Sequence, residues 1–318
     1  MKSARAAELM AILQRGDSVL MDGALGTELE RHELPIEGEG WSAYAVRDYP
    51  QVISDIHRQY IDTGARIHIV NSFALARHVL EPLGLGDEFE ALNRQAVALF
   101  ERAVELAGAD RDTLWAAGSL STFAANSDRS LLPRGDALVA NYRDQAGILL
   151  DAGVDLFALE MLFDVDVTQA MLRAIAGFDL PAIVGFTCEW GGGDRREVIT
   201  HSGVGQPPAL LADVLARVFE DADNSNLIFS IMHSDADVTD AALEILRRHW
   251  QGPVAIYPNS GDFVDLHLQF DSVCSDDDFA VAAQGWLREG VQIIGGCCGI
   301  GPSHIRRLGG KLTWSSAG

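Results

Sequence analysis

Residues 67–120 read IHIVNSFALARHVLEPLGLGDEFEALNRQAVALFERAVELAGADRDTLWAAGSL, and this stretch contains two short apolar runs separated by a segment with helical spacing. The runs IHIVNSF (67–73) and LWAAGSL (114–120) have the length and composition of buried strands. Between them, apolar side chains recur along one stripe of a helix, namely Phe89, Leu92, Ala96, Leu99, Phe100 and Val104. The stretch therefore predicts a strand, a helix and a second strand in succession.

Six further apolar runs resemble these two and bring the number of predicted strands to eight. They are VLMDGA from Val19, LFALEML from Leu156, AIVGFTC from Ala182, LIFSIMH from Leu227, VAIYPNS from Val254 and QIIGGCC from Gln292. Helix-length segments fill most of the intervals, which predicts an α/β fold, a parallel (β/α)8 TIM barrel, with a doubly wound open sheet as the alternative. No linker or low-complexity tract divides residues 1–318, so we expect a single domain.

The composition narrows the class of protein. A chain of 318 residues with 48% hydrophobic residues can bury a large core, and a net charge of -22 disfavours binding to nucleic acid. The N-terminal residues carry charges throughout, and no run approaches the roughly 18 apolar residues of a membrane span. We therefore expect a cytoplasmic protein without nucleic-acid or membrane partners, and the sequence indicates no oligomeric state. In a reducing compartment, the four cysteines favour thiol or metal chemistry over disulfides.

Polar and sulfur-bearing residues cluster at the C-terminal ends of the predicted strands. They are Asp22, Asn71, Ser72, Ser119, Glu160, Cys188, His233, Asn259, Ser260, Cys297 and Cys298. In a barrel these ends meet on one face, where the active sites of this fold lie. Apolar runs generally give way to polar loops at strand ends, which accounts for Asn71 and the serines without any function. Asp22 and Glu160 differ, because carboxylates within apolar runs are seldom buried without a partner.

Two adjacent cysteines, Cys297 and Cys298, lie between glycine pairs in the last run. In an extended strand their side chains would point to opposite faces, but the flanking glycines permit a turn that brings both to one side. Two thiolates favour zinc, and His233 at the end of LIFSIMH is the best third ligand, which leaves a fourth position open as in catalytic zinc sites. Two inert buried thiols and a structural histidine are the alternative.

Five segments of the chain resemble those of the homocysteine S-methyltransferase family: MDGALGTELER (21–31), IHRQYIDTGARIHIVNSFALARHVL (56–80), DLFALEML (155–162), AIYPNSGD (255–262) and IIGGCCGIGPSHIRRL (293–308). The resemblance extends over nearly the whole chain. It implies a zinc-dependent barrel in which Cys297 and Cys298 are zinc ligands. The implied reaction transfers a methyl group from a small sulfonium donor, S-methylmethionine or S-adenosylmethionine, to the thiol of homocysteine, giving methionine.

The resemblance also implies which residues bind the substrate: Asp22, Gly23, Ala24, Leu25, Glu160 and Asn259. The two carboxylates would hold the substrate ammonium, and backbone N–H groups of the loop would receive its carboxylate. Asn259 would lie beside the metal. Because the leaving group is a neutral thioether, no general acid is required, and no catalytic residue is expected beyond the metal site.

The chain departs from the family pattern at one metal ligand. The family's third zinc cysteine closes the sixth strand in an Asn-Cys pair, and this chain has Met232 and His233 there. Two thiolates and a neutral imidazole leave zinc formally neutral, so a bound thiolate should be less nucleophilic than beside three thiolates. Two other functions therefore stay open: a non-catalytic barrel that binds amino acids, and a zinc enzyme acting on another thiol.

Overall fold

The computed structural model describes residues 2–32, 34, 40–124, 129–192, 197–201, 207–220, 226–264 and 267–309. Eight parallel strands form one sheet: β1 (Val19–Leu20), β2 (Ile67–Val70), β3 (Trp115–Ser121), β4 (Leu156–Leu162), β5 (Ala182–Phe186), β8 (Leu227–Asp235), β9 (Val254–Asn259) and β12 (Ile293–Ile294). Their order in the sheet is β1-β12-β9-β8-β5-β4-β3-β2. Each strand therefore lies beside the strands of this sheet that come before and after it along the chain.

The two edge strands meet, and the sheet closes into a barrel. Met21 pairs with Ile67 in a parallel bridge, and Arg66 N–H donates to Leu20 O at 2.8 Å. This closure confirms the predicted (β/α)8 barrel and excludes the open sheet. Six strands begin at the predicted residue, while β3 and β12 begin one residue later.

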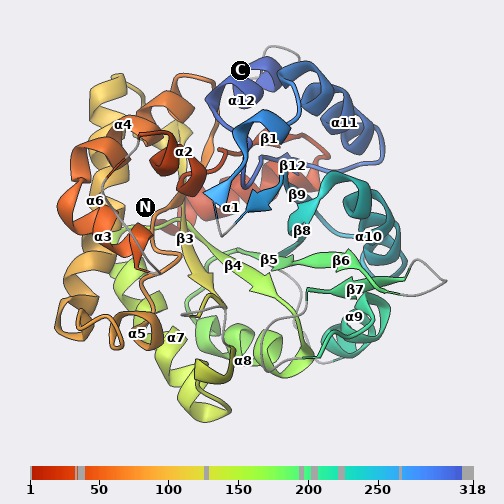
Figure 1. Cartoon of the computed structure of the whole chain (residues 1–318), viewed down its shortest axis with the longest axis horizontal. Coiled ribbons are helices and arrows are strands. Elements are labelled where there is room, and N and C mark those ends of the chain that lie inside the picture. Colours follow the sequence, from red (N-terminus) through yellow and green to blue (C-terminus); the bar gives the residue numbers. More distant parts are fainter. Residues whose placement is uncertain are drawn as a thin grey trace.

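Helices surround the barrel (Figure 1). They include α4 (Pro50–Ile61), α6 (Phe89–Ala107), α7 (Asp136–Ala152), α8 (Val165–Ile175), α9 (Leu211–Glu220), α10 (Ala236–His249), α11 (Asp276–Arg288) and α12 (Pro302–Gly309). The connections after β1 and β2 also contain the short helices α2 (Gly26–Arg31), α3 (Trp41–Asp48) and α5 (Arg77–Leu80). Two antiparallel hairpins follow β5 and β9, namely β6 (Cys188–Trp190) with β7 (Val198–Thr200) and β10 (Phe263–Val264) with β11 (His267–Leu268). Within the described ranges, no helix is long and apolar enough to cross a membrane.

Helix α6 follows the predicted stripe closely. All six apolar residues of the stripe are buried and belong to the main hydrophobic core. The helix ends before Gly108, which has a φ of +61°. Glycine adopts this left-handed conformation readily, so it terminates the helix where the apolar stripe ends.

Side chains on each strand alternate between the barrel interior and the helical layer. On β4, Leu156 points into the barrel and Phe157 packs against the helices. The N-terminal helix α1 (Lys2–Gln14) covers the amino ends of the strands, because Leu9 and Leu13 pack on the interior residues. Figure 1 shows α1 across the centre of the ring. The site must therefore be built at the carboxyl ends of the strands.

Candidate active site

The paired cysteines lie on a tight turn directly after β12. Ile300 N–H donates to Cys297 O at 3.0 Å. Gly299 has a φ of +82°, and a Cβ atom there would lie 2.1 Å from Ser260 O, so glycine alone fits. The predicted turn is confirmed, and it brings the sulfur atoms of Cys297 and Cys298 within 3.8 Å of each other.

His233 reaches the cysteines from β8. The register of this strand is irregular after Met232, and His233 has a φ of +50°. A non-glycine residue in this conformation costs on the order of 1 kcal/mol or more and persists where the surrounding structure holds it. The Nδ1 atom lies 3.0 Å from Cys297 Sγ, and the Nε2 atom lies 2.9 Å from Glu160 Oε2. His233 thus bridges the cysteine turn and a buried carboxylate, while Met232 stays in the barrel interior.

Glu160 projects from β4 at a second irregularity of register, where Met161 has a φ of +59°. Its carboxylate is buried, and both oxygens are hydrogen bonded. Oε1 accepts from the Ser119 hydroxyl, and Oε2 faces His233 Nε2. The expectation that this carboxylate has a partner is confirmed, and it has two.

The hydrogen bonds indicate where the protons lie. A carboxylate in its ionised form can only accept, and the contact of Glu160 Oε2 with His233 then requires the proton on Nε2 and leaves the Nδ1 lone pair facing Cys297 Sγ. Burial raises the pKa of the Cys297 thiol, while the hydrogen bond with Cys297 lowers the pKa of the Cys298 thiol. The two sulfur atoms and the imidazole nitrogen lie close enough together to be candidate ligands of one metal ion.

Asp22 lies at the end of β1 and is buried. Its Oδ2 atom accepts from Ile69 N–H at 2.9 Å, whereas Oδ1 has no hydrogen-bond partner among the described residues. Burial raises the pKa of Asp22 well above its usual range, and the charge of Glu160 raises it as well. A buried acceptor without a partner is costly, so this oxygen is suited to a cationic ligand group.

The loop after Asp22 is tightly packed. A Cβ atom on Gly23 would lie 2.3 Å from Ile300 O, so the backbone here approaches its neighbours closely. Ala24 N–H donates to Ile300 O at 3.0 Å and is therefore engaged within the fold. No hydrogen bond from the N–H groups of Gly23 or Leu25 to the described part of the chain is present, so these two remain candidates for binding a substrate carboxylate.

Asn259 supports the cysteine turn from the end of β9. Its Oδ1 atom accepts from Cys298 N–H at 3.2 Å. The residue thus lies beside the predicted metal ligands, and its amide oxygen holds the backbone that presents one of them.

A second group of metal-capable residues was not predicted from the sequence. Ligand atoms of Asp22, His57 and His68 lie within 4.8 Å of one another. Both histidines are fully buried between α4, α6 and β2, and both rings pack near Phe100. Burial lowers the pKa of His57 to about 3 and that of His68 to about 4, so both are neutral. The sequence offered one signal for this group, because His57 shares a helical face with the apolar residues Ile53 and Tyr60 and is buried with them in α4.

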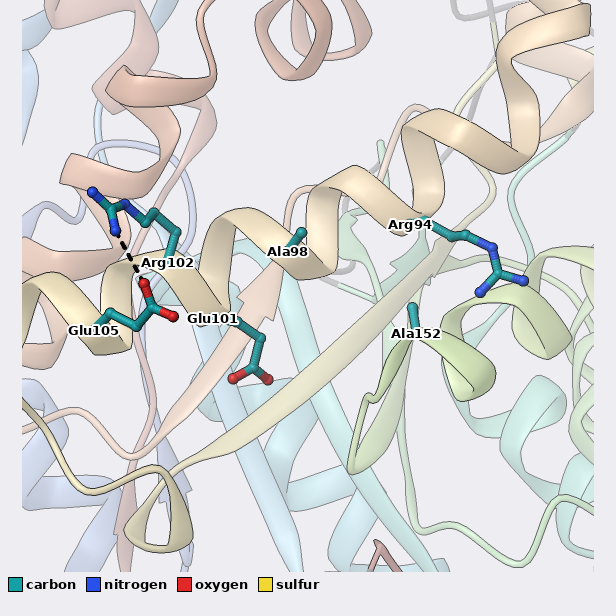
Figure 2. A pocket seen from close by; sticks show the side chains of 6 residues that line it. All are labelled: Arg94, Ala98, Glu101, Arg102, Glu105 and Ala152. Carbon is teal, nitrogen blue, oxygen red and sulfur yellow. Dashed lines mark hydrogen bonds and ion pairs between the residues drawn. The ribbon is translucent and has the colours of Figure 1, made fainter.

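One hollow lies elsewhere, on the outer surface of α6 near the end of α7 (Figure 2). It measures about 500 Å³ and has Ala98 and Ala152 among its lining residues. The charged residues that line it have partners: Arg94 pairs with Glu90, Arg102 with Glu105, and Glu101 with Arg111. It offers no unpaired group for a ligand and lies away from the carboxyl ends of the strands.

Known proteins resemble this chain over nearly its whole length. A sequence model of the family described as "Homocysteine S-methyltransferase" matches residues 19–312. The homocysteine S-methyltransferase of Escherichia coli (strain K12) is 29% identical over 94% of this chain and 97% of its own, and the selenocysteine methyltransferase of Astragalus bisulcatus is 25% identical over 93% and 92%. A crystal structure of the homocysteine methyltransferase from Escherichia coli in its metallated form is 26% identical, with a TM-score of 0.73 over 95% of this chain and 99% of that chain. Because the family model covers nearly the whole chain, the protein belongs to the homocysteine S-methyltransferase family and is an S-methyltransferase.

Proposed function

We propose that this enzyme transfers a methyl group from a small sulfonium donor to the thiol of homocysteine, giving methionine. The observation that carries the proposal is the meeting of a thiol and imidazole cluster with the unpaired carboxylate oxygen of Asp22 at one end of the barrel. The first is suited to binding a thiolate through a metal ion, and the second to binding the ammonium of an amino acid. The names of the relatives support the same acceptor.

The donor set fits zinc. In a tetrahedral site with bonds of about 2.3 Å to sulfur and about 2.0 Å to nitrogen, two sulfur atoms lie about 3.8 Å apart and a sulfur and a nitrogen about 3.5 Å apart. The two thiols are 3.8 Å apart, and Cys297 Sγ lies 3.0 Å from His233 Nδ1. A movement of about half an ångström would bring Nδ1 to the expected distance from Cys297 Sγ, and Cys297, Cys298 and His233 would then hold the ion with a fourth position open.

A free thiol has a pKa of about 8.5. Bound zinc would lower the pKa of the substrate thiol and so supply a thiolate nucleophile at neutral pH. Asp22 would hold the ammonium, and the N–H groups of Gly23 and Leu25 would receive the carboxylate. The acceptor sulfur then forms a bond to the methyl carbon while the bond from that carbon to the donor sulfonium breaks. The thiol proton passes to solvent, and the donor leaves as a neutral thioether.

Aromatic side chains support a cationic donor. The Phe73 ring lies 5.8 Å from the ring of His233 and 5.4 Å from that of Phe123. Aromatic faces attract cations, so a sulfonium centre could bind against Phe73 beside the metal ligands. S-methylmethionine and S-adenosylmethionine both provide such a centre.

The buried group of Asp22, His57 and His68 is a poorer place for the catalytic metal. Both histidines are fully buried, and neither thiols nor the partly exposed His233 contribute to the group. A catalytic metal must be reached by substrate, and a thiolate-rich site suits zinc better than an Asp and two imidazoles enclosed by helices.

The selenocysteine methyltransferase among the relatives favours a second acceptor, the selenol of selenocysteine.

Metal analysis of freshly purified protein, combined with a methylation assay, tests the proposal. Cys297→Ser and Cys298→Ser should each lose zinc and activity, while Cys188→Ala, which removes a buried thiol outside the cluster, should keep both. The assay compares homocysteine and selenocysteine as acceptors with each sulfonium donor. Stoichiometric zinc of unchanged affinity in both serine variants would overturn the joint site, and zinc loss in His57→Ala alone would place the metal in the buried group.

A further inference from the structure

The two buried carboxylates of the site have different surroundings. Both oxygens of Glu160 are hydrogen bonded, one to the Ser119 hydroxyl and one to His233 Nε2 at 2.9 Å. Asp22 has one oxygen without a partner in the described ranges. A substrate ammonium would meet a free acceptor at Asp22, but at Glu160 it would have to share or displace His233.

We propose that Glu160 is a positioning residue for His233 and that Asp22 alone receives the substrate ammonium. The inference rests on the proposed zinc site. By accepting from Nε2–H, the carboxylate holds the neutral imidazole in the tautomer whose Nδ1 lone pair faces the cysteines. Carboxylates that bind the second nitrogen of a metal-binding histidine orient the ring and increase its basicity.

The backbone is bent at both ends of this contact. His233 and Met161, the residue after Glu160, have φ of +50° and +59°, and each lies at an irregularity in its strand. The two strands, β8 and β4, are separated by β5. On β5, a Cβ atom on Gly185 would lie 1.9 Å from Met232 Sδ, so the absent side chain leaves space for the residue before His233. Strain of this kind persists where the fold requires a particular side-chain placement.

The contact also compensates for the missing third thiolate. Zinc with two thiolates and a neutral imidazole carries no net charge, and the carboxylate of Glu160 adds one negative charge through the Nε2 hydrogen bond. The total then equals that of zinc with three thiolates. The reduced nucleophilicity expected from the loss of a cysteine is therefore offset by the carboxylate behind His233.

A double-mutant cycle on zinc affinity tests the inference. Zinc affinity is measured by competition with a chromophoric chelator for the native protein, Glu160→Gln, His233→Cys and the double variant. Glu160→Gln keeps an oxygen that can accept from Nε2–H but removes the charge, and it should weaken zinc binding by about ten- to hundred-fold. In the His233→Cys background the same change should have no effect, because a thiolate has no N–H to donate.

Asp22→Asn is the matched control, since it removes the other buried carboxylate without touching His233. Its zinc affinity should be unchanged. Ser119→Ala provides a milder variant that loosens Glu160, and it should weaken zinc binding only when His233 is present. Unchanged zinc affinity in folded Glu160→Gln, or an equal loss in both backgrounds, would overturn the inference. Should His233→Ala retain native zinc affinity, the proposed metal site itself would be wrong, so the two failures are distinguishable.

Discussion

Replacing Asp22 by asparagine should weaken substrate binding through one identified interaction. The side chain keeps its size, and its oxygen can still accept from Ile69 N–H, as Asp22 Oδ2 does at 2.9 Å. Burial raises the pKa of Asp22, so its carboxyl group gives up its proton when the substrate ammonium arrives, and the change removes the negative charge formed in this way. A hydrogen bond to a charged group contributes about 1.5–3 kcal/mol, so the KM for homocysteine should rise by about 10- to 150-fold.

The matched control is 4-mercaptobutyrate, which is homocysteine without its amino group. Methyl transfer to each thiol is measured with the same donor at saturation, for the native protein and for Asp22→Asn. The KM for 4-mercaptobutyrate should be unchanged, because this thiol has no ammonium. An equal rise in KM for both thiols would refute the assignment of Asp22 to the ammonium.

The same variant should also change how stability depends on pH. Burial raises the pKa of Asp22, so the folded protein keeps a proton that the unfolded chain releases above about pH 3.9. The folded state binds more protons in this window, and its stability falls as the pH rises from the unfolded pKa through the folded pKa. Asp22→Asn lacks this titration, so urea unfolding should show a smaller loss of stability with rising pH. Parallel pH profiles for the two proteins would contradict this account.

Three further changes have defined outcomes. In chelator competition, His233→Ala should bind zinc much more weakly than the native protein, and His233→Cys should bind it at least as tightly. Equal zinc affinity of His233→Ala and the native protein would mean that His233 is a structural residue and not a ligand. Gly299→Ala should destabilise the protein by about 1–3 kcal/mol in urea unfolding, because of its φ of +82° and the contact with Ser260 O, and should lower zinc content. Burial lowers the pKa of His57 from 6.5 to about 3, so between these pH values the unfolded chain binds a proton that the folded protein does not, and stability falls on acidification. His57→Leu removes this titration and should reduce the loss of stability by up to about 1.4 kcal/mol per pH unit. An unchanged acid profile would mean that His57 is not buried as described.

The strands of the barrel were predictable because each is a short apolar run, buried on both faces. The residue at which such a run begins is set by composition alone, and six of the eight strands begin where the sequence placed them. The cysteine turn was predictable for a related reason. Glycine permits a left-handed backbone, so the glycines around the cysteines allow a turn to be expected from the sequence, although the sequence does not show that Gly299 is the one with a positive φ.

The contacts within the site were less predictable, because they depend on departures from regular strands. Alternation along β4 and β8 gives no indication that Met161 and His233 adopt positive φ, and it is at these bends that Glu160 meets His233. The engagement of Ala24 N–H by Ile300 O joins residues from opposite ends of the chain. The group formed by Asp22 with His57 and His68 depends on how α4 packs on β2, which neither segment specifies by itself.

The presence of histidine at residue 233 has consequences for its neighbours. In the proposed site, a buried imidazole that binds zinc through Nδ1 would leave an Nε2–H that must be satisfied, and Glu160 Oε2 lies 2.9 Å from Nε2. A thiolate ligand has no such N–H. Under this proposal His233 engages the carboxylate of Glu160, so recognition of the substrate amino group would fall to Asp22. One such interaction contributes about 1.5–3 kcal/mol, which limits the selectivity for an amino-acid thiol over a simple thiol to about 10- to 150-fold. Thiols without an amino group should therefore be poorer but functional acceptors for this enzyme, and any greater selectivity would have to come from the carboxylate site at Gly23 and Leu25.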